Sequence, residues 1–254
     1  MNRPARRAVV LAGGMGTRLA PFTTVLPKPL MPIGDRAILD VVLRQLGGHG
    51  FTDLTIAVGY LAHLIRAVFG DGSQHGVEID YHVEDEPLGT AGPLRAVPGV
   101  EDTFLAMNGD ILTTLDFRKL FDRHRESGNV LTIATHRRTV RSEYGVLDVQ
   151  AGPGPVQRVT GYEEKPEVAY IVSMGIYVVE PEALEHVPEN TRFDIPDLVN
   201  ALLAAGRPVG SYLFDGYWLD IGRHDDYAQA LDDAPRILPE LLSAATRAGA
   251  GGPP

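Results

Sequence analysis

The first residues that could do chemistry lie in a glycine-rich stretch near the start of the chain. Residues 1–34 hold basic side chains and no acidic one, and the basic residues are Arg3, Arg6, Arg7, Arg18 and Lys28. Arg18 and Lys28 lie ten residues apart inside a loop that is rich in glycine and proline. The backbone N–H groups of a tight glycine turn can bind an anion, and an arginine can bind two phosphate oxygens at once. This stretch therefore predicts a binding site for a polyphosphate.

Two common phosphate-binding loops are excluded at this position. The dinucleotide-binding fingerprint needs a third glycine where Leu19 stands, and an acidic residue where Gly59 and Tyr60 follow the expected second strand. A P-loop needs Gly-Lys followed by Ser or Thr, and this stretch does not contain that sequence. The glycine-rich loop is thus of another type.

The composition of the 254-residue chain limits the class of protein. Apolar residues make up 44% and charged residues 22%, which is ordinary for a globular protein. A net charge of −10 argues against nucleic acid or an anionic membrane as a partner. The absence of cysteine excludes disulfides and thiolate chemistry. The apolar stretch at residues 8–12 is too short for a signal peptide, so we expect a cytoplasmic protein.

The elements that must position these residues follow an alternating pattern. The expected strands are 8–12, 54–58, 77–83, 104–107, 130–135, 145–149, 156–163, 170–179 and 209–214. The expected helices are 38–46, 61–69, 90–97, 116–127 (with Asp116 as N-cap), 193–205 and 225–231. The order in the first half predicts a parallel sheet covered by helices, which binds ligands at the carboxyl ends of its strands. We expect one domain over residues 1–242, with halves at 7–129 and 130–232, and a flexible tail at 243–254.

Several strings, in this order, resemble the signatures of the sugar-1-phosphate nucleotidyltransferases (NDP-sugar pyrophosphorylases). The strings are LAGGMGTRLAPFT at 11–23, LPKPLMPI at 26–33, EDEPLGTAG at 84–92, NGD at 108–110, YGV at 144–146, EEKP at 163–166 and WLDIG at 218–222. The resemblance covers residues 7–232, and the nearest branch is the mannose-1-phosphate or heptose-1-phosphate guanylyltransferases. It implies a Rossmann-like three-layer α/β sandwich of the nucleotide-diphospho-sugar transferase type, with a mostly parallel mixed sheet and a small added β region.

The implied reaction joins a sugar 1-phosphate to a nucleoside triphosphate and releases pyrophosphate. The attacking phosphate is already an anion near neutral pH, so cations and positioning matter more than a general base. By resemblance, Asp110 and Asp220 hold Mg²⁺, Arg18 binds the triphosphate and the leaving pyrophosphate, and Lys28 binds the α-phosphate. Arg18, Lys28 and Asp110 are the expected catalytic residues. The expected nucleotide-binding residues are Leu11, Gly13, Gly14, Gly16, Thr17, Arg18, Lys28, Glu84 and Gly89.

The resemblance assigns the sugar phosphate to the second half of the chain. Lys165 would hold its phosphate and Glu164 the sugar hydroxyls, while the Tyr144-Gly145 backbone would approach the sugar closely. Gly109 and Ser173 complete the expected substrate-binding set. Relatives usually carry Asn-Ala-Gly at the strand where this chain has serine at residue 173. A heptose, a hexose or a sugar-like cyclitol phosphate therefore all remain open.

Glu84 carries the prediction of the base. Guanine presents two adjacent donors that one carboxylate can accept, and relatives that use uridine or thymidine nucleotides usually carry glutamine at this position. We therefore expect GTP, with dTTP, UTP or ATP as alternatives, and with an ordinary acidic turn at 84–86 as the competing interpretation. A non-catalytic nucleotide-sugar sensor and a glycosyltransferase are the other functions considered. Relatives commonly form dimers or tetramers, so a homo-oligomer is expected.

Overall fold

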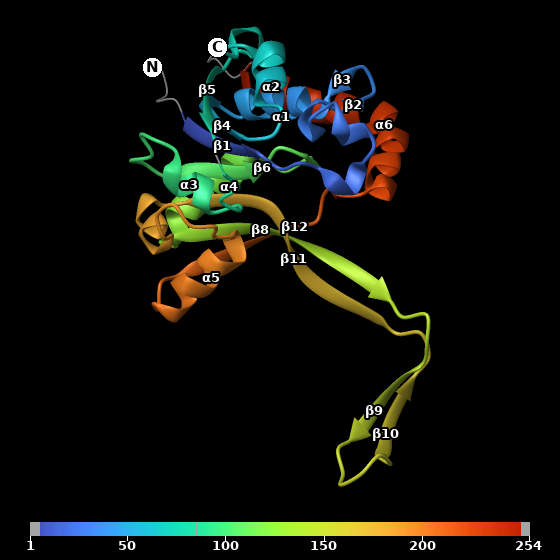
Figure 1. Cartoon of the computed structure of the whole chain (residues 1–254). Helices are drawn as coiled ribbons and strands as arrows, with labels where there is room; N and C mark the ends of the chain where they lie inside the picture. Colours follow the sequence, from blue (N-terminus) through green and yellow to red (C-terminus); the bar gives the residue numbers. More distant parts are fainter. Residues whose placement is uncertain (1–5, 85, 250–254) are drawn as a thin grey trace.

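A computed structural model describes residues 6–84 and 86–249. Its centre is a seven-stranded sheet in the order β12-β8-β11-β6-β1-β4-β5 (Figure 1). The strands are β1 (Arg6–Ala12), β4 (Phe51–Val58), β5 (Glu78–Val83), β6 (Phe104–Asn108), β8 (Leu131–Arg141), β11 (Glu167–Val179) and β12 (Val209–Phe214). β11 runs antiparallel to its neighbours β6 and β8, whereas the other pairs are parallel. The mostly parallel mixed sheet expected from the sequence is confirmed.

β1 is an interior strand of the sheet, because its apolar run can be buried on both faces. Ala8, Val9 and Val10 are all fully buried. Successive side chains of a strand point to opposite faces. Ala8 and Val10 accordingly join one hydrophobic core, and Val9 joins the other.

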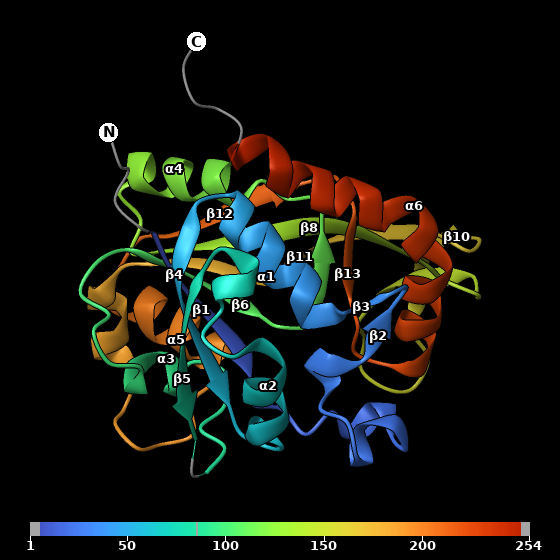
Figure 2. The ribbon, with the colours of Figure 1, turned by 90° about the horizontal axis from the view of Figure 1, so that it is seen from above.

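Helices cover both faces of the sheet. They are α1 (Ile38–Gly48), α2 (Ala62–Phe69), α3 (Gly92–Ala96), α4 (Phe117–Ser127), α5 (Ile195–Ala204) and α6 (His224–Gly249). α1, α2 and α4 contribute to the first core, and α3 and α5 to the second, so the sheet lies between two helical layers (Figures 1 and 2). The expected start of α4 is confirmed, since Asp116 Oδ1 accepts a hydrogen bond from the N–H of Lys119 at 2.9 Å. The structure is the expected three-layer α/β sandwich.

A third, smaller core joins α6 to α1 and to the loop after β1 (Figure 2). Its members are Leu19, Met31, Ile33, Ile38, Val41, Leu112, Leu219, Ile221, Ala230, Ala234, Ile237, Leu238 and Leu241. Several of them lie within three residues of Arg18, Lys28, Asp110 or Asp220. This core therefore fixes the segments that carry the predicted phosphate and metal ligands.

α6 is much longer than the helix expected at 225–231. Pro235 and Pro239 lie inside it, and prolines at such positions normally interrupt a helix. Burial of Ile237 and Leu241 in the third core offsets that cost. α6 continues to Gly249, so the expected tail at 243–254 begins inside a helix, and residues 250–254 lie outside the described residues. Within residues 6–84 and 86–249, no helix combines the length and the apolar character that a membrane span requires.

Three small antiparallel pairs complete the fold. They are β2 (Pro32–Ile33) with β3 (Arg36–Ala37), β7 (Ile111–Thr113) with β13 (Trp218–Asp220), and β9 (Val146–Gln150) with β10 (Arg158–Glu163). β8 and β11 run past the sheet as a two-stranded ribbon and carry the β9–β10 hairpin away from the body (Figure 1). The sequence prediction ended the first of these strands at residue 135. The extension at 136–141 is mostly polar and solvent-exposed, so it lacks the apolar alternation that predicts a strand.

Candidate active site

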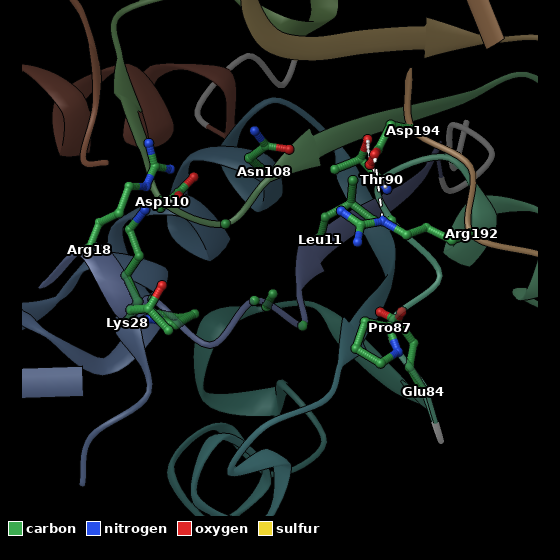
Figure 3. A pocket seen from close by; sticks show the side chains of 18 residues that line it. Leu11, Arg18, Lys28, Glu84, Pro87, Thr90, Asn108, Asp110, Arg192 and Asp194 are labelled. Atoms are coloured by element: carbon green, nitrogen blue, oxygen red, sulfur yellow. Dashed lines mark hydrogen bonds and ion pairs between the residues drawn. The ribbon is translucent and has the colours of Figure 1, made fainter. Parts of the chain in front are cut away.

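A cleft of about 530 Å³ lies at the carboxyl ends of β1, β5 and β6 (Figure 3). It is lined by Leu11, Ala12, Gly13, Gly14, Gly16, Thr17, Arg18, Lys28, Pro29, Glu84, Pro87, Gly89, Thr90, Asn108, Gly109, Asp110, Arg192 and Asp194. Every residue expected to bind the nucleotide is in this set, together with Gly109 and Asp110. Arg18, Lys28 and Asp110 are grouped on one side of the cleft, and Glu84 lies on the opposite side. The roles of these residues remain predictions, but the structure brings them together.

Two glycines of the loop after β1 lie where a side chain would not fit. A Cβ on Gly13 would lie 2.7 Å from Glu84 Oε1 and 3.6 Å from the backbone N of Gly59. Gly16 has a φ of 63°, in the left-handed region that favours glycine. The Thr23 hydroxyl donates a hydrogen bond to the Gly16 carbonyl at 2.8 Å, and Leu19 is fully buried. The loop is thus held at both ends and leaves its middle facing the cleft.

Short segments bring the charged side chains together. The Nζ of Lys28 forms an ion pair with Asp110 Oδ2, and Lys28 is only 9% exposed. β13 pairs with β7 so that Asp220 lies opposite Ile111, and the N–H of Ile221 donates to the Asp110 carbonyl at 3.1 Å. Asp110 and Asp220, far apart in the sequence, are therefore neighbours in space.

Arg18 lies against the same segment. A Cβ on Gly222 would be 3.7 Å from both Nη atoms of Arg18, which is ordinary van der Waals contact, so the guanidinium lies beside this glycine. Partial burial raises the pKa of the Asp220 carboxyl, and the charge of Asp110 raises it further, while Lys28 and Arg18 act in the opposite direction. The carboxylates of Asp110 and Asp220 thus interact electrostatically with each other, and Lys28 and Arg18 partly offset their repulsion.

The carboxylate pair fits a hard divalent cation. The Oδ1 of Asp110 is buried and accepts no hydrogen bond. Carboxylate oxygens are the ligands that such cations prefer, and phosphate oxygens and water complete their coordination. Among the described residues, no three or more His, Cys, Asp or Glu side chains cluster in a way that could hold a metal. A cation here would therefore take ligands from the substrates as well as from Asp110 and Asp220.

A second cavity of about 600 Å³ lies beside this pair. It is lined by Arg18, His136, Arg137, Arg138, Thr139, Trp218, Leu219, Asp220, Gly222, Arg223, Asp226 and Gln229. Arg18 lines both cavities, Asp110 lines the first and Asp220 the second. Two ligands could thus occupy separate cavities and come together where Arg18, Asp110 and Asp220 lie.

Of the residues expected to bind the sugar, Gly109 lines the first cleft, and the others line neither cavity. Ser173 lies on β11, and its hydroxyl is 3.1 Å from the Tyr177 hydroxyl. Tyr144, Gly145, Glu164 and Lys165 lie on or beside the β9–β10 hairpin, and Tyr144 is 79% exposed. These five residues lie on the second half of the chain, as the sequence predicted, and their roles remain predictions.

The sequence did not predict the contribution of the segment before α5. Asp194 Oδ1 accepts a hydrogen bond from the N–H of Thr90 at 3.0 Å, and Asp194 caps α5 reciprocally with Asp197. Arg192 lies 3.9 Å from the Asp194 carboxylate and lines the first cleft (Figure 3). The capping pattern of Asp194 and Asp197 could have been found in the sequence. No sequence signal points to Arg192.

A glycine loop, two cations and an aspartate pair lie together at the carboxyl ends of a mostly parallel sheet, where such folds bind their ligands. The family model described as "Nucleotidyl transferase" matches residues 7–236, and the chain belongs to that family. The family expected from the sequence motifs is thus confirmed.

Curated relatives differ in their nucleotide. The chain is 35% identical over 245 residues to the UTP–glucose-1-phosphate uridylyltransferase of Synechocystis sp., covering 89% of this chain and 62% of that protein. It is 33% identical over 228 residues to the mannose-1-phosphate guanyltransferase of Aspergillus fumigatus, covering 87% and 62%. The chain thus spans about 62% of the length of these relatives.

Solved structures confirm the fold. A putative glucose-1-phosphate thymidylyltransferase from Bacillus anthracis, in complex with a sucrose, has a TM-score of 0.72 and 25% identity, covering 92% of this chain and 96% of its own. HddC from Yersinia pseudotuberculosis has a TM-score of 0.68 and 25% identity, covering 90% and 99%. The nucleotide-diphospho-sugar transferase type of fold is therefore shown.

Proposed function

We propose that this protein transfers a nucleotidyl group from a nucleoside triphosphate to a sugar 1-phosphate and releases pyrophosphate. The observation that carries the proposal is the meeting of two cavities at Arg18, Asp110 and Asp220. The reaction needs this arrangement because two negatively charged substrates must be held with their phosphates in contact.

The first cleft would hold the triphosphate. Its glycine loop offers backbone N–H groups, and Arg18 offers a planar guanidinium that can bind the β- and γ-phosphate oxygens. Arg18 and Lys28 lie at one end of the cleft and Glu84 at the other (Figure 3), and the start of the glycine loop, at Gly13, lies beside Glu84. An extended nucleotide would therefore place its phosphates beside the carboxylate pair and its base beside Glu84.

The chemistry requires neither a protein nucleophile nor a redox step. An oxygen of the sugar phosphate forms a bond to the α-phosphorus, and the bond from that phosphorus to the bridging oxygen breaks, so that pyrophosphate leaves with the electron pair. Lys28 would stabilise the charge that builds on the α-phosphate, and Arg18 the charge on the pyrophosphate. A divalent cation on Asp110 and Asp220, which we propose is Mg²⁺, would reduce the repulsion between the two phosphates.

We propose GTP as the nucleotide. The Oε2 of Glu84 accepts one hydrogen bond, from the N–H of Leu88 at 3.1 Å, and a carboxylate has further acceptor sites for the two donors of guanine. Two hydrogen bonds, from the N1–H and N2–H₂ groups of guanine to the Glu84 carboxylate, would select guanine over uracil or thymine, which offer one donor. The relatives include a guanyltransferase and a uridylyltransferase, so this choice rests on Glu84.

The second cavity would hold the sugar 1-phosphate. Arg137 and Arg138 at the base of the β8–β11 ribbon can bind a phosphate, and Asp226 and Gln229 can accept hydrogen bonds from hydroxyl groups. A hexose, a heptose or a cyclitol would each present such hydroxyls.

The test is a matrix of GTP, ATP, UTP, CTP and dTTP against a panel of sugar 1-phosphates, read by pyrophosphate formation with Mg²⁺. We expect turnover with GTP to be fastest, and Asp110→Asn to abolish it. Binding without turnover for every pair would support a sensor instead. Faster turnover with UTP or dTTP would keep the reaction class and contradict the proposed base.

A further inference from the structure

A third basic residue, Arg192, lies in the first cleft and has no part in the phosphate chemistry proposed above. Among the described residues that line this cleft, the basic ones are Arg18, Lys28 and Arg192. Lys28 is paired with Asp110, and Arg18 lines the second cavity as well. Figure 3 shows Arg192 on the side of the cleft that carries Glu84, across from Arg18 and Lys28. Arg192 therefore lies where the base of the nucleotide is expected, and not where its phosphates are.

The backbone beside Arg192 is hydrogen-bonded to the loop that follows Glu84. The N–H of Phe193 donates to the Leu88 carbonyl at 2.9 Å, and the Phe193 carbonyl accepts the N–H of Ala91 at 2.9 Å. The N–H of Leu88 in turn donates to Glu84 Oε2 at 3.1 Å. Leu88 thus connects the segment that carries Arg192 with the Glu84 carboxylate, so one hydrogen-bonded unit presents both charged residues to the cleft.

The side chain of Arg192 has only a weak partner in the described part of the chain. Its Nε lies 3.9 Å from Asp194 Oδ2, which is too long for a hydrogen bond, and 75% of the side chain is exposed. Asp194 Oδ1 already accepts the N–H and the hydroxyl of Thr90, at 3.0 and 3.2 Å. An exposed ion pair of this length contributes little to stability. The terminal N–H groups of Arg192 can therefore donate to a ligand in the cleft.

Guanine presents a pattern that a carboxylate and a guanidinium can bind together. Along one edge the base carries the N2–H₂ and N1–H donors, followed by the O6 and N7 acceptors. A carboxylate accepts from the two donors, and the planar fork of an arginine fits O6 and N7, which is the commonest specific contact of proteins with guanine in DNA. Adenine has an amino group in place of O6, and its hydrogens would face the N–H groups of the arginine. The two side chains together therefore distinguish guanine from adenine as well as from uracil and thymine.

We propose that Arg192 is a second base-selecting residue, which donates hydrogen bonds to O6 and N7 of a guanine whose N1–H and N2–H₂ groups bind Glu84. This role rests on the proposed function, since it requires a guanine nucleotide in the first cleft. Arg192 acts on the binding of the base and takes no part in the transfer. Its loss should therefore raise Kd and KM for GTP and leave kcat nearly unchanged.

The analogue 7-deaza-GTP tests the contact, because a C–H group replaces N7 while the N1–H and N2–H₂ donors and O6 are kept. In calorimetric titrations, the wild type should bind 7-deaza-GTP at least about tenfold more weakly than GTP, since it loses a hydrogen bond from a charged donor. Arg192→Ala should bind the two nucleotides with nearly equal Kd. A variant that keeps the wild-type preference for GTP overturns the proposal, and so does a wild type that binds both nucleotides equally.

Titrations with UTP separate recognition of the base from contacts that every nucleotide shares. In Arg192→Ala, Kd for GTP should rise at least about tenfold, and Kd for UTP should change less than about twofold. An equal loss for GTP and UTP would mean that Arg192 binds the ribose or the phosphates, and would overturn the proposal. The matched control is Arg123→Ala, because Arg123 is also an exposed arginine, paired with Glu126 at 2.7 Å, and lines neither cavity. It should bind all three nucleotides as the wild type does.

These titrations contain no sugar phosphate and measure no turnover, so they test the base contact separately from the reaction. A wild type that prefers GTP over 7-deaza-GTP through Arg192 but releases no pyrophosphate with any sugar 1-phosphate would contradict the transferase reaction alone. Pyrophosphate release that is fastest with GTP, in a protein whose Arg192→Ala variant keeps the preference for GTP over 7-deaza-GTP, would contradict the role of Arg192 alone. A wild type that binds UTP more tightly than GTP would overturn both the proposed base and the role of Arg192.

Discussion

The substitution Glu84→Gln tests how the cleft selects its base. The N–H of Glu84 donates to the Val58 carbonyl at 2.9 Å, which extends the pairing of β4 and β5. Its Oε2 accepts the N–H of Leu88, and its Oε1 lies 2.7 Å from the position that a Cβ on Gly13 would take. A glutamine fits this space and keeps an acceptor for Leu88. The substitution therefore removes the charge and leaves the surrounding loops in place.

For GTP we expect a large loss of catalytic efficiency. A hydrogen bond to a charged group contributes about 1.5–3 kcal/mol, and one between neutral groups about 0.5–1.5 kcal/mol. Guanine would lose the charge from both bonds, and one of its donors would face the amide NH₂, so the net loss is about 2–3 kcal/mol. Because about 1.4 kcal/mol is tenfold in rate, kcat/KM for GTP should fall about 30- to 160-fold. For UTP it should be unchanged or should rise.

The assay is pyrophosphate release with GTP, UTP and dTTP, each with the best sugar 1-phosphate. Glu86→Gln is the matched control, because Glu86 is a nearby exposed carboxylate that lines neither cavity. An equal fall for all three nucleotides would refute the reasoning, since it would mean that Glu84 positions the loop and does not bind the base. A fall in the Glu86 variant alone would refute it as well.

The pH dependence gives an independent check on the same residue. Burial raises the pKa of the Glu84 carboxyl, and the N–H of Leu88 and the ring of His82 act against this shift. A protonated carboxyl loses an acceptor, so kcat/KM for GTP should decline as the pH falls through a value above the ordinary range for glutamate. Profiles from about pH 8 to about pH 5 should show this decline in the wild type, and Glu84→Gln should remove its contribution.

Three further outcomes are expected. Asp110→Asn should lower kcat at least about 100-fold. It should also lower the unfolding free energy by about 2 kcal/mol, which is about 4–8 °C in Tm, because the buried Lys28 loses its charged partner. Asp215→Asn, at an exposed position, is the control and should change neither kcat nor Tm. Gly89→Ala should cost about 1–3 kcal/mol and raise KM for the nucleotide, because its φ is 83° and a Cβ would lie 2.7 Å from a backbone carbonyl oxygen. Gly128→Ala, with a φ of 70° and open space, should cost about 1 kcal/mol and leave KM unchanged. Burial lowers the pKa of His124, so the imidazole stays neutral in the folded state at a pH where the unfolded chain already binds a proton. Tm should therefore decrease as the pH is lowered from about 6.5. His124→Gln should make Tm, measured by calorimetry, less dependent on pH in this range.

Local sequence signals predicted the parts of the site that lie within one loop. The glycine turn, Arg18 and Lys28 follow β1 directly, so their order in the chain already places them at the end of a strand. Asp110 and Asp220 meet through β7 and β13, which are three residues long each. Strands of that length carry no periodicity, so the resemblance to a family predicted this pair and the spacing of apolar residues did not.

The parts that the sequence missed depend on tertiary contacts. Residues 136–141 are mostly polar, and they form a strand because β11 pairs with them along the ribbon. Pro235 and Pro239 predict a break in α6, which the third core overrides. The position of Arg192 follows from the start of α5 at the edge of the cleft, and no local pattern specifies that edge.

The third core has a consequence for how the protein loses activity. Leu19, Leu112, Leu219 and Ile221 lie within two residues of the charged residues of the site, and all four belong to the third core, which they share with residues of α6, and to neither core of the main sheet. Partial unfolding of the C-terminal helix would therefore scatter the reactive groups while leaving the seven strands intact. On warming, inactivation should precede the loss of β-structure measured by circular dichroism, and amide exchange should be faster in α6 than in β1.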